Sequence, residues 1–272
     1  MLQKSYANIN LSIYSDGEVK ELDPKFISYK PGEKTEGKNF TIYTNRIDPS
    51  SLNGTNSYTA LKEAEIFNDY ENNVAIGSYS HAEGYSTLAY GENSHAEGYV
   101  TASSGNNSHA EGYITKAYGE NSHTEGYMTE AFSIASHAEG YITKASNEGA
   151  HAEGNKTEAS GMYSHAEGNE TKASGDYSHA EGSETKASGD YSHAEGVRTR
   201  AGAAYSHAEG GGSKAGGMYS HAEGGSNAGG AFSHAEGNLS KAYGVRSHAE
   251  GYNTLARGYD SHAEGTSVTA YG

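Results

Sequence analysis

The sequence predicts an all-β protein, a parallel β-roll in which short coils of chain stack along one axis. The pentapeptide SHAEG, or a near copy of it, recurs with a period of 14 residues. Gly recurs at two fixed positions of each period, Ala at two others, and Thr or Ser at a fifth. Only 34% of the 272 residues are apolar, against about 45–50% in ordinary globular domains. A large core of Leu, Ile and Val is therefore not available, and a stack of small residues takes its place.

Composition narrows the protein class further. A net charge of −16 with low hydrophobicity is typical of disordered chains, but the strict period indicates a stacked solenoid instead. The chain has no Cys, which excludes disulfides and thiolate metal sites. It has no apolar run of about 18 residues, so no membrane insertion is expected. Lys and Arg are spread singly along the repeats, so we expect no basic patch and no nucleic-acid partner.

Residues 1–72 differ from the rest, hold all three prolines and predict a small β-rich head or attachment module. Apolar residues alternate with polar ones from Ile9 to Ile13, which is strand spacing. The sequence SDG at 15–17 then predicts a turn into a β-hairpin. NFTIYTNRI at 39–47 predicts a further strand. TALKEAEIFNDY at 59–70 fits a short helix or, alternatively, a degenerate entry coil.

Residues 73–272 form the repeat array. With Ser as position 1, the unit reads S-H-A-E-G-x-x-T-x-A-x-G-x-x, and every His of the protein occupies position 2. The spacing is 14 throughout, except for 13 between His221 and His234. Fourteen residues fit two short strands and two tight turns, with the glycines at positions 5 and 12 placed at the turns to allow a positive φ. Coils about 4.8 Å apart would make a rod of roughly 65 Å.

Side chains alternate between the two faces of a strand, which orients the unit. Position 9 is often Lys or Glu and should face water, so Thr at 8 and Ala at 10 should face the interior. Across that interior could lie either Ala at 3 or the pair of His at 2 and Glu at 4. We favour Ala, because a narrow roll of Ala and Thr closes without burying charge. His and Glu then share the outer face.

An outer face with the same polar pair in fourteen coils predicts a symmetric interface, most simply three chains around a three-fold axis. Imidazole and carboxylate are tolerable there when they hydrogen-bond to each other or through water. Such pairing would raise the pKa of each imidazole above about 6.5 on assembly. The predicted trimer-interface ladder comprises His81, Glu83, His95, Glu97, His109, Glu111, His123, Glu125, His137, Glu139, His151, Glu153, His165, Glu167, His179, Glu181, His193, Glu195, His207, Glu209, His221, Glu223, His234, Glu236, His248, Glu250, His262 and Glu264.

The same pairs are candidate metal ligands, because imidazole and carboxylate suit zinc or nickel. The candidates are His95, Glu97, His109 and Glu111. We favour a structural ladder without metal or cofactor, because the pattern repeats with the coil alone and lacks the HExxH spacing of zinc proteases.

Three other hypotheses follow from single positions of the unit. A Ser-His-Glu triad is not expected, since adjacent Ser80 and His81 point to opposite faces of a strand; the protein is not expected to be an enzyme. An ice-binding Thr row requires outward Thr side chains, which the Lys and Glu at position 9 argue against. Tyrosines at positions 6, 11 and 14 suit turn packing better than carbohydrate or protein recognition.

The segment ENSHAEGYVTASSGNN at 92–107 resembles the head repeat of YadA-type trimeric autotransporter adhesins, whose pattern runs roughly N-S-V-A-I-G-x-x-S-x-A-x-G-x-x. The resemblance covers about 73–272, with His95 and Glu97 in place of the family's apolar pair. It implies a trimeric left-handed parallel β-roll and a surface adhesin role. VAIG at 74–77 looks like the same signature out of phase, and fits the A-x-G half of an entry coil. SHAEG arrays also resemble segments of tail-fibre and neck-appendage proteins from phages of Gram-positive hosts.

These observations predict an extracellular, cell-surface or virion-borne fibrous protein. The array would serve as a rigid homotrimeric rod that displays surfaces for a host protein or glycan, whose identity the sequence does not indicate. A phage tail-fibre segment is one alternative to a bacterial adhesin. A metal- or pH-responsive His/Glu scaffold is another, from a different functional class.

Overall fold

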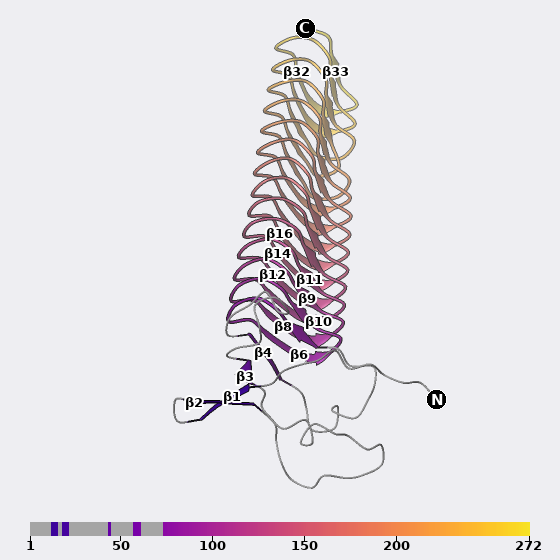
Figure 1. Ribbon diagram of the computed structural model, residues 1–272. Helices are drawn as coiled ribbons and strands as arrows, with labels where there is room; N and C mark the ends of the chain where they lie inside the picture. The colour runs from indigo at the N-terminus through magenta and orange to yellow at the C-terminus, as the bar shows by residue number, and fades with distance from the viewer. Residues whose placement is uncertain (1–11, 16–17, 22–42, 45–56, 61–72) are drawn as a thin grey trace, which may run out of the picture.

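The computed structural model describes residues 12–15, 18–21, 43–44, 57–60 and 73–272 of the chain. These residues form β-strands and turns and include no helix, so none that could cross a membrane. Two long sheets run side by side along one stack of coils, with the N-terminal strands at one end and β32 and β33 at the other (Figure 1). The predicted all-β roll is confirmed.

The described N-terminal strands confirm one prediction and correct another. β1 (Ser12–Ser15) and β2 (Glu18–Glu21) pair antiparallel, as the predicted hairpin requires, and residues 16–17 between them lie outside the described residues. β3 (Tyr43–Thr44) lies within the third expected strand and pairs antiparallel with β4 (Ser57–Ala60). Of the two alternatives for 59–70, the helix is wrong at its start, because Thr59 and Ala60 belong to β4, and the parallel pairing of β4 with β6 favours the entry coil. The remainder of 59–70 lies outside the described residues, as do Ile9 and Leu11.

One sheet continues from β4 into the long strands of the array, each of which begins at a His. β4 lies parallel to β6, so residues assigned to the N-terminal module extend the sheet of the roll. The strands are β6 (His81–Tyr85), β8 (His95–Tyr99), β10 (His109–Tyr113), β12 (His123–Tyr127), β14 (His137–Tyr141), β16 (His151–Asn155), β18 (His165–Asn169), β20 (His179–Ser183), β22 (His193–Val197), β24 (His207–Glu209), β26 (His221–Glu223), β28 (His234–Glu236), β30 (His248–Tyr252) and β32 (His262–Thr266).

The second sheet holds the two-residue strands of positions 9 and 10. They are β5 (Val74–Ala75), β7 (Leu88–Ala89), β9 (Ala102–Ser103), β11 (Lys116–Ala117), β13 (Glu130–Ala131), β15 (Lys144–Ala145), β17 (Glu158–Ala159), β19 (Lys172–Ala173), β21 (Lys186–Ala187), β23 (Arg200–Ala201), β25 (Lys214–Ala215), β27 (Asn227–Ala228), β29 (Lys241–Ala242), β31 (Leu255–Ala256) and β33 (Thr269–Ala270). Ala75 pairs with Ala89, so VAIG is the entry half-coil that the sequence predicts.

All strands of the array are parallel and in register, so each repeat position stacks on its own copy. His109 pairs with His95 and His123, for example. The 13-residue spacing does not break this register, because His221 still pairs with His234. The missing residue is absorbed in the turn after β26, where the buried Ser226 takes position 8. Any side chain repeated in the sequence is therefore repeated along the rod at the pitch of the coils.

The interior is filled by small side chains, as the sequence predicts. The alanines of positions 3 and 10 are almost all 0% exposed, with Ala166 and Ala173 as examples from one coil. Thr171 at position 8 and Ser164 at position 1 are also buried. The Ser hydroxyl donates a hydrogen bond to the carbonyl three residues before it, at 2.7 Å from Ser164 to Gly161, and so closes the turn. Ala, rather than the His–Glu pair, faces inward.

Each glycine of the unit has only part of the role that the sequence suggests. Gly98 at position 5 has a φ of 118° but lies inside the long strand, not at a turn. Gly175 at position 12 has no positive φ; a Cβ there would lie 2.0 Å from the carbonyl oxygen of Gly189 in the next coil. Close approach between coils therefore explains the second glycine of the unit.

The left-handed turn residues are positions 7 and 14, which are mostly not Gly. Val100 and Ile114 have φ values of 56°, an unfavourable region for β-branched residues. Each amide donates a hydrogen bond to the preceding coil, at 2.8 Å from Val100 to the carbonyl of Tyr85. Stacking therefore holds a conformation that an isolated turn would avoid.

Candidate functional site: the histidine–glutamate face

The fourteen His side chains form one unbroken column on the outer face of the long-strand sheet. Consecutive rings are parallel, with centroids 4.6–4.9 Å apart and interplanar angles of 1–9°, from His81 to His262. The column exists because parallel in-register strands place each His beside the next. We call this surface, His at position 2 with Glu at position 4, the His–Glu face.

In thirteen of the fourteen coils, the Glu of the face lies within 4.0 Å of the His of its own strand, the exception being Glu125. The distance from His Nε2 to Glu Oε2 runs from 3.4 Å at His137 and Glu139 to 4.0 Å at His234 and Glu236. These are contacts between ionisable groups but exceed ordinary hydrogen-bond lengths. In every coil from His95 to His248, Nε2 is enclosed and has no hydrogen-bond partner among the described residues. The direct His–Glu hydrogen bonds expected from the sequence are therefore not made within the single chain.

In the single chain the pKa values of several imidazoles are lowered, whereas the predicted rise concerns the assembled state and stays a prediction. Burial, followed by the charge of the neighbouring imidazoles His137 and His165, lowers the pKa of His151 to about 4. Burial is likewise the largest cause of the lowered pKa values of His109 and His248, ahead of their imidazole neighbours. The carboxylates do act in the expected direction, but burial, together with the charge of the adjacent imidazoles, outweighs them.

The metal candidates lie together on this face, but not in coordinating geometry. Nε2 of His95 lies 3.8 Å from Oε2 of Glu97, and the distance is the same for His109 and Glu111. Along the column, sets of two His and one Glu bring three donor atoms within 4.8 Å of one another, for example His151, Glu153 and His165. Zinc–ligand bonds of about 2.0–2.2 Å need donor atoms closer than this. Parallel rings also direct their lone pairs side by side rather than toward one point.

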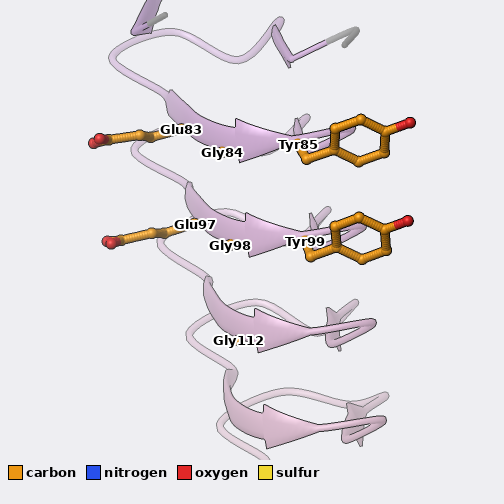
Figure 2. Close-up of a pocket in the computed structure, with 7 residues that line it drawn as sticks. All are labelled: Glu83, Gly84, Tyr85, Glu97, Gly98, Tyr99 and Gly112. Atoms are coloured by element: carbon orange, nitrogen blue, oxygen red, sulfur yellow. The ribbon is translucent and has the colours of Figure 1, made fainter. Parts of the chain in front are cut away.

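Beside the His–Glu face lies a shallow groove of about 380 Å³. Figure 2 shows its floor of stacked glycines, Gly84 among them, with Glu83 and Glu97 projecting on one side and Tyr85 and Tyr99 on the other. These tyrosines begin a column that continues to Tyr141 with centroids 4.8–5.0 Å apart.

A second aromatic column occupies position 14, at another turn of the coil. It runs from Tyr163 to Phe232 with centroids 4.7–5.4 Å apart. Its rings are roughly half-exposed, 51% for Tyr191. In both columns the ring faces cover one another, so edges and hydroxyl groups meet solvent. The columns therefore lack the open faces on which sugars or bases stack.

Two sequence hypotheses are settled by side-chain direction. Ser80 is buried and donates to the carbonyl of Gly77, whereas His81 projects outward, so the two are on opposite faces as expected. The Thr row is interior, since Thr115 and Thr171 are 0% exposed. A solvent-facing Thr array for binding ice is therefore absent from residues 73–272.

Sequence analysis missed a feature of the opposite, short-strand face. Lys172, Lys186, Arg200 and Lys214 are scattered in the chain, but they occupy position 9 of consecutive coils and pair in register. The expectation that the cations form no patch is therefore wrong. The 14-residue spacing between these residues was the signal that could have revealed the row.

Comparisons with known proteins add no relative: no family model matches the chain, and no curated protein matches it. The resemblance to YadA-type head repeats stays a prediction from the repeat unit.

Proposed function

We propose that this chain is a non-enzymatic fibrous protein whose array forms a rigid rod for attachment to a host or other surface. The rod is a homotrimer in which the His–Glu faces of three copies meet around a common axis. It acts outside the cell, on a bacterial surface as an adhesin or on a virion as part of a tail fibre. Its mechanism is mechanical: nearest-neighbour stacking gives stiffness, and repeated surfaces raise avidity.

The unbroken His–Glu column is the observation that carries this proposal. Positions 2 and 4 hold the same two residues in all fourteen coils, while position 9 of the other sheet holds Leu, Ala, Lys, Glu, Arg, Asn or Thr. Positions 2 and 4 face outward on the long-strand sheet, and position 9 faces outward on the short-strand sheet. A surface that meets only solvent has no reason to keep one pair at every coil, whereas a surface that meets identical copies has the same neighbour at every level.

The burial of the column supports an interface more than a free surface. His151 and His165 are each 34% exposed before any partner is added. Their Nε2 atoms are enclosed without a hydrogen-bond partner among the described residues. Packing a second chain over the carboxylates would press them toward the imidazoles, and a small shortening of the 3.5 Å contact between His151 and Glu153 makes a hydrogen bond. Assembly thereby satisfies atoms that the single chain leaves unpaired.

Spin labels on single introduced cysteines test this arrangement, because the chain has no Cys of its own. The variants are Glu167→Cys on the His–Glu face and Lys172→Cys on the short-strand face, five residues away. We expect a short distance between chains for the label at 167 and a longer one for the label at 172. A shorter distance at 172, or no distance between chains at either site, contradicts the proposal.

A metal-responsive scaffold is the second candidate, favoured by the recurring sets of two His and one Glu. Elemental analysis of the purified protein, followed by titration with Zn²⁺, separates the two functions. Under the first proposal the protein contains no stoichiometric metal, and chelator does not change its assembly. Stoichiometric zinc whose removal dissociates the rod would establish the second candidate instead.

A further inference from the structure

The short-strand face carries exposed cations that pair with nothing in the described chain. They are Lys186, Arg200, Lys214 and Lys241, all exposed at position 9, and we call them the cation row. None of the four lies within 4.0 Å of a carboxylate in residues 73–272. Three occupy consecutive coils, and Asn227 separates Lys214 from Lys241.

Most cations elsewhere on the array have partners, Arg257 being an exception among the described residues. Lys116 contacts Glu130 at 3.0 Å, and Lys156 contacts Glu170 at 3.2 Å, each pair joining adjacent coils. Two arginines make bidentate contacts with carboxylates one coil away, and Lys144 lies over the ring of Phe132. The cation row is therefore a local departure from a general pattern, and like charges placed directly beside one another weaken a sheet.

From Arg200 to Lys241, acidic residues are also absent from the surroundings of the row, whereas Lys186 has Glu184 and Asp190 in its own coil. Between Val197 and Tyr259 the only acids are Glu209, Glu223, Glu236 and Glu250, and all four are at position 4 on the opposite sheet. In this part of the rod, negative charge lies on one face and the row on the other. A chain of net charge −16 thus presents a strip of positive potential.

Glycines keep the strip open. Gly216 follows Lys214 by two residues in the same coil, and a Cβ added to it would meet nothing within 4 Å. A Cβ added to Gly202, two residues after Arg200, would meet only the carbonyl oxygen of Ala215, at 3.8 Å. Packing does not require these glycines, unlike Gly175. Their effect is a surface on which a ligand can approach the cations without obstruction.

We propose that the cation row binds a linear anionic polysaccharide laid along the rod axis. The cations repeat at the pitch of the coils, so a polymer with an anionic group on successive sugars can meet several of them at once, and weak contacts add through multivalency. This gives the proposed attachment function a ligand class, while depending on the opposite face from the one that forms the trimer.

Nucleic acid fits the strip less well. Duplex DNA carries one charge per about 1.7 Å and requires a denser cation surface than one per coil. The tyrosine columns offer edges rather than open ring faces, so single-stranded bases have no stacking platform.

The test uses immobilised dextran sulfate as the probe, neutral dextran as the ligand control, and a titration with NaCl. The row variant combines Lys186→Gln, Arg200→Gln, Lys214→Gln and Lys241→Gln. The matched control combines Lys116→Gln, Lys144→Gln, Lys156→Gln and Arg246→Gln, which removes the same charge from partnered sites. Circular dichroism and light scattering are recorded for each protein, so that folding, trimer formation and ligand binding are judged separately.

We expect the parent chain to bind dextran sulfate and not dextran. The row variant should bind at least about tenfold more weakly with a shallower salt dependence, and the control within about threefold of the parent. Failure of the parent to bind, or equal losses in both variants, overturns the proposal. So does tighter binding of duplex DNA than of dextran sulfate. A row variant that dissociates the assembly would instead show that the strip contacts another copy of the chain.

Discussion

The two sheets of this roll share one interior but have very different outer faces. On the long-strand sheet the exposed pair is His and Glu in all fourteen coils, whereas the short-strand sheet changes its exposed residue from coil to coil. The backbone geometry of the two faces repeats equally well, so it does not explain the difference. The proposed trimer accounts for the difference, because a face at a three-fold axis would have the same neighbour at every level and the opposite face would not. On that proposal, repetition within a single chain distinguishes residues that hold an assembly together from residues of a variable surface.

Enlarging the shared interior should produce the largest effect, and equally from either sheet. Ala166→Leu on the long strand and Ala173→Leu on the short strand each add volume at a site that is 0% exposed. We expect each to cost roughly 3 kcal/mol and to lower the melting temperature by roughly 10 °C, because a roll filled by Ala and Thr has no space for Leu. Thermal denaturation followed by circular dichroism measures this.

The control is Ser174→Leu, an exposed position in the same coil, which should change the melting temperature little. If only one of the two interior variants were destabilised, the two sheets would not share a single interior.

Acid should weaken the His–Glu face without affecting the short-strand face. His151 is faced by His137 and His165 in adjacent coils and by Glu139 and Glu153, and its folded pKa of about 4 lies below the ordinary 6.5. The folded state therefore binds fewer protons than the unfolded state between these values. The contribution of His151 to the stability of the folded state is therefore greatest above about pH 6.5, and it declines as the pH falls toward 4.

We expect the melting temperature to be roughly 5–10 °C lower at pH 5 than at pH 8, with little change between pH 8 and pH 9. A higher melting temperature at pH 5 would instead support imidazoles whose pKa is raised by their carboxylate partners.

Removing one ring from the column should shift the titration of its neighbour. In His165→Gln, the positive charge that helps to lower the pKa of His151 is lost, so that pKa should rise. Burial still lowers it, so it should stay below 6.5. An NMR titration of the His151 ring protons measures the shift.

Lys172→Gln is the matched control, because it removes a cation from the other sheet and should leave this titration unchanged. Equal titration of His151 in the parent and in His165→Gln would mean that the stacked rings do not interact electrostatically.

Ion pairs on the variable surface should matter least. Glu184 accepts two hydrogen bonds from Arg198 in the next coil, but both groups are exposed to water. Glu184→Gln should change the melting temperature by about 1 °C or less at moderate salt, because solvent screens exposed pairs. A change as large as that of Ala166→Leu would show that surface charge, rather than interior packing, stabilises the coils.

Sequence reasoning predicts the array well where one residue has one role. The period requires two strands per coil, and the polar residues at position 9 orient Ala and Thr inward, as the structure confirms. Sequence reasoning fails where the role of a residue depends on the adjacent coil. Gly175 is needed because of a carbonyl 2.0 Å from its missing Cβ, and Val100 accepts a left-handed φ because of a hydrogen bond to Tyr85.

The same cause explains what was missed at the candidate site. A His–Glu pair viewed in isolation predicts a raised pKa, but in the single chain burial, followed by the charge of the neighbouring imidazoles, lowers the pKa of His151. The cation row was missed because Lys186, Arg200 and Lys214 are distant in sequence and become neighbours only when the coils stack in register.

The mass of the chain in solution tests the central claim most directly. Multi-angle light scattering at pH 8 should give about three times the 28.6 kDa of one chain, because the His–Glu faces of three copies meet along the rod. A mass of 28.6 kDa at micromolar concentration, with every imidazole open to solvent, would contradict the account.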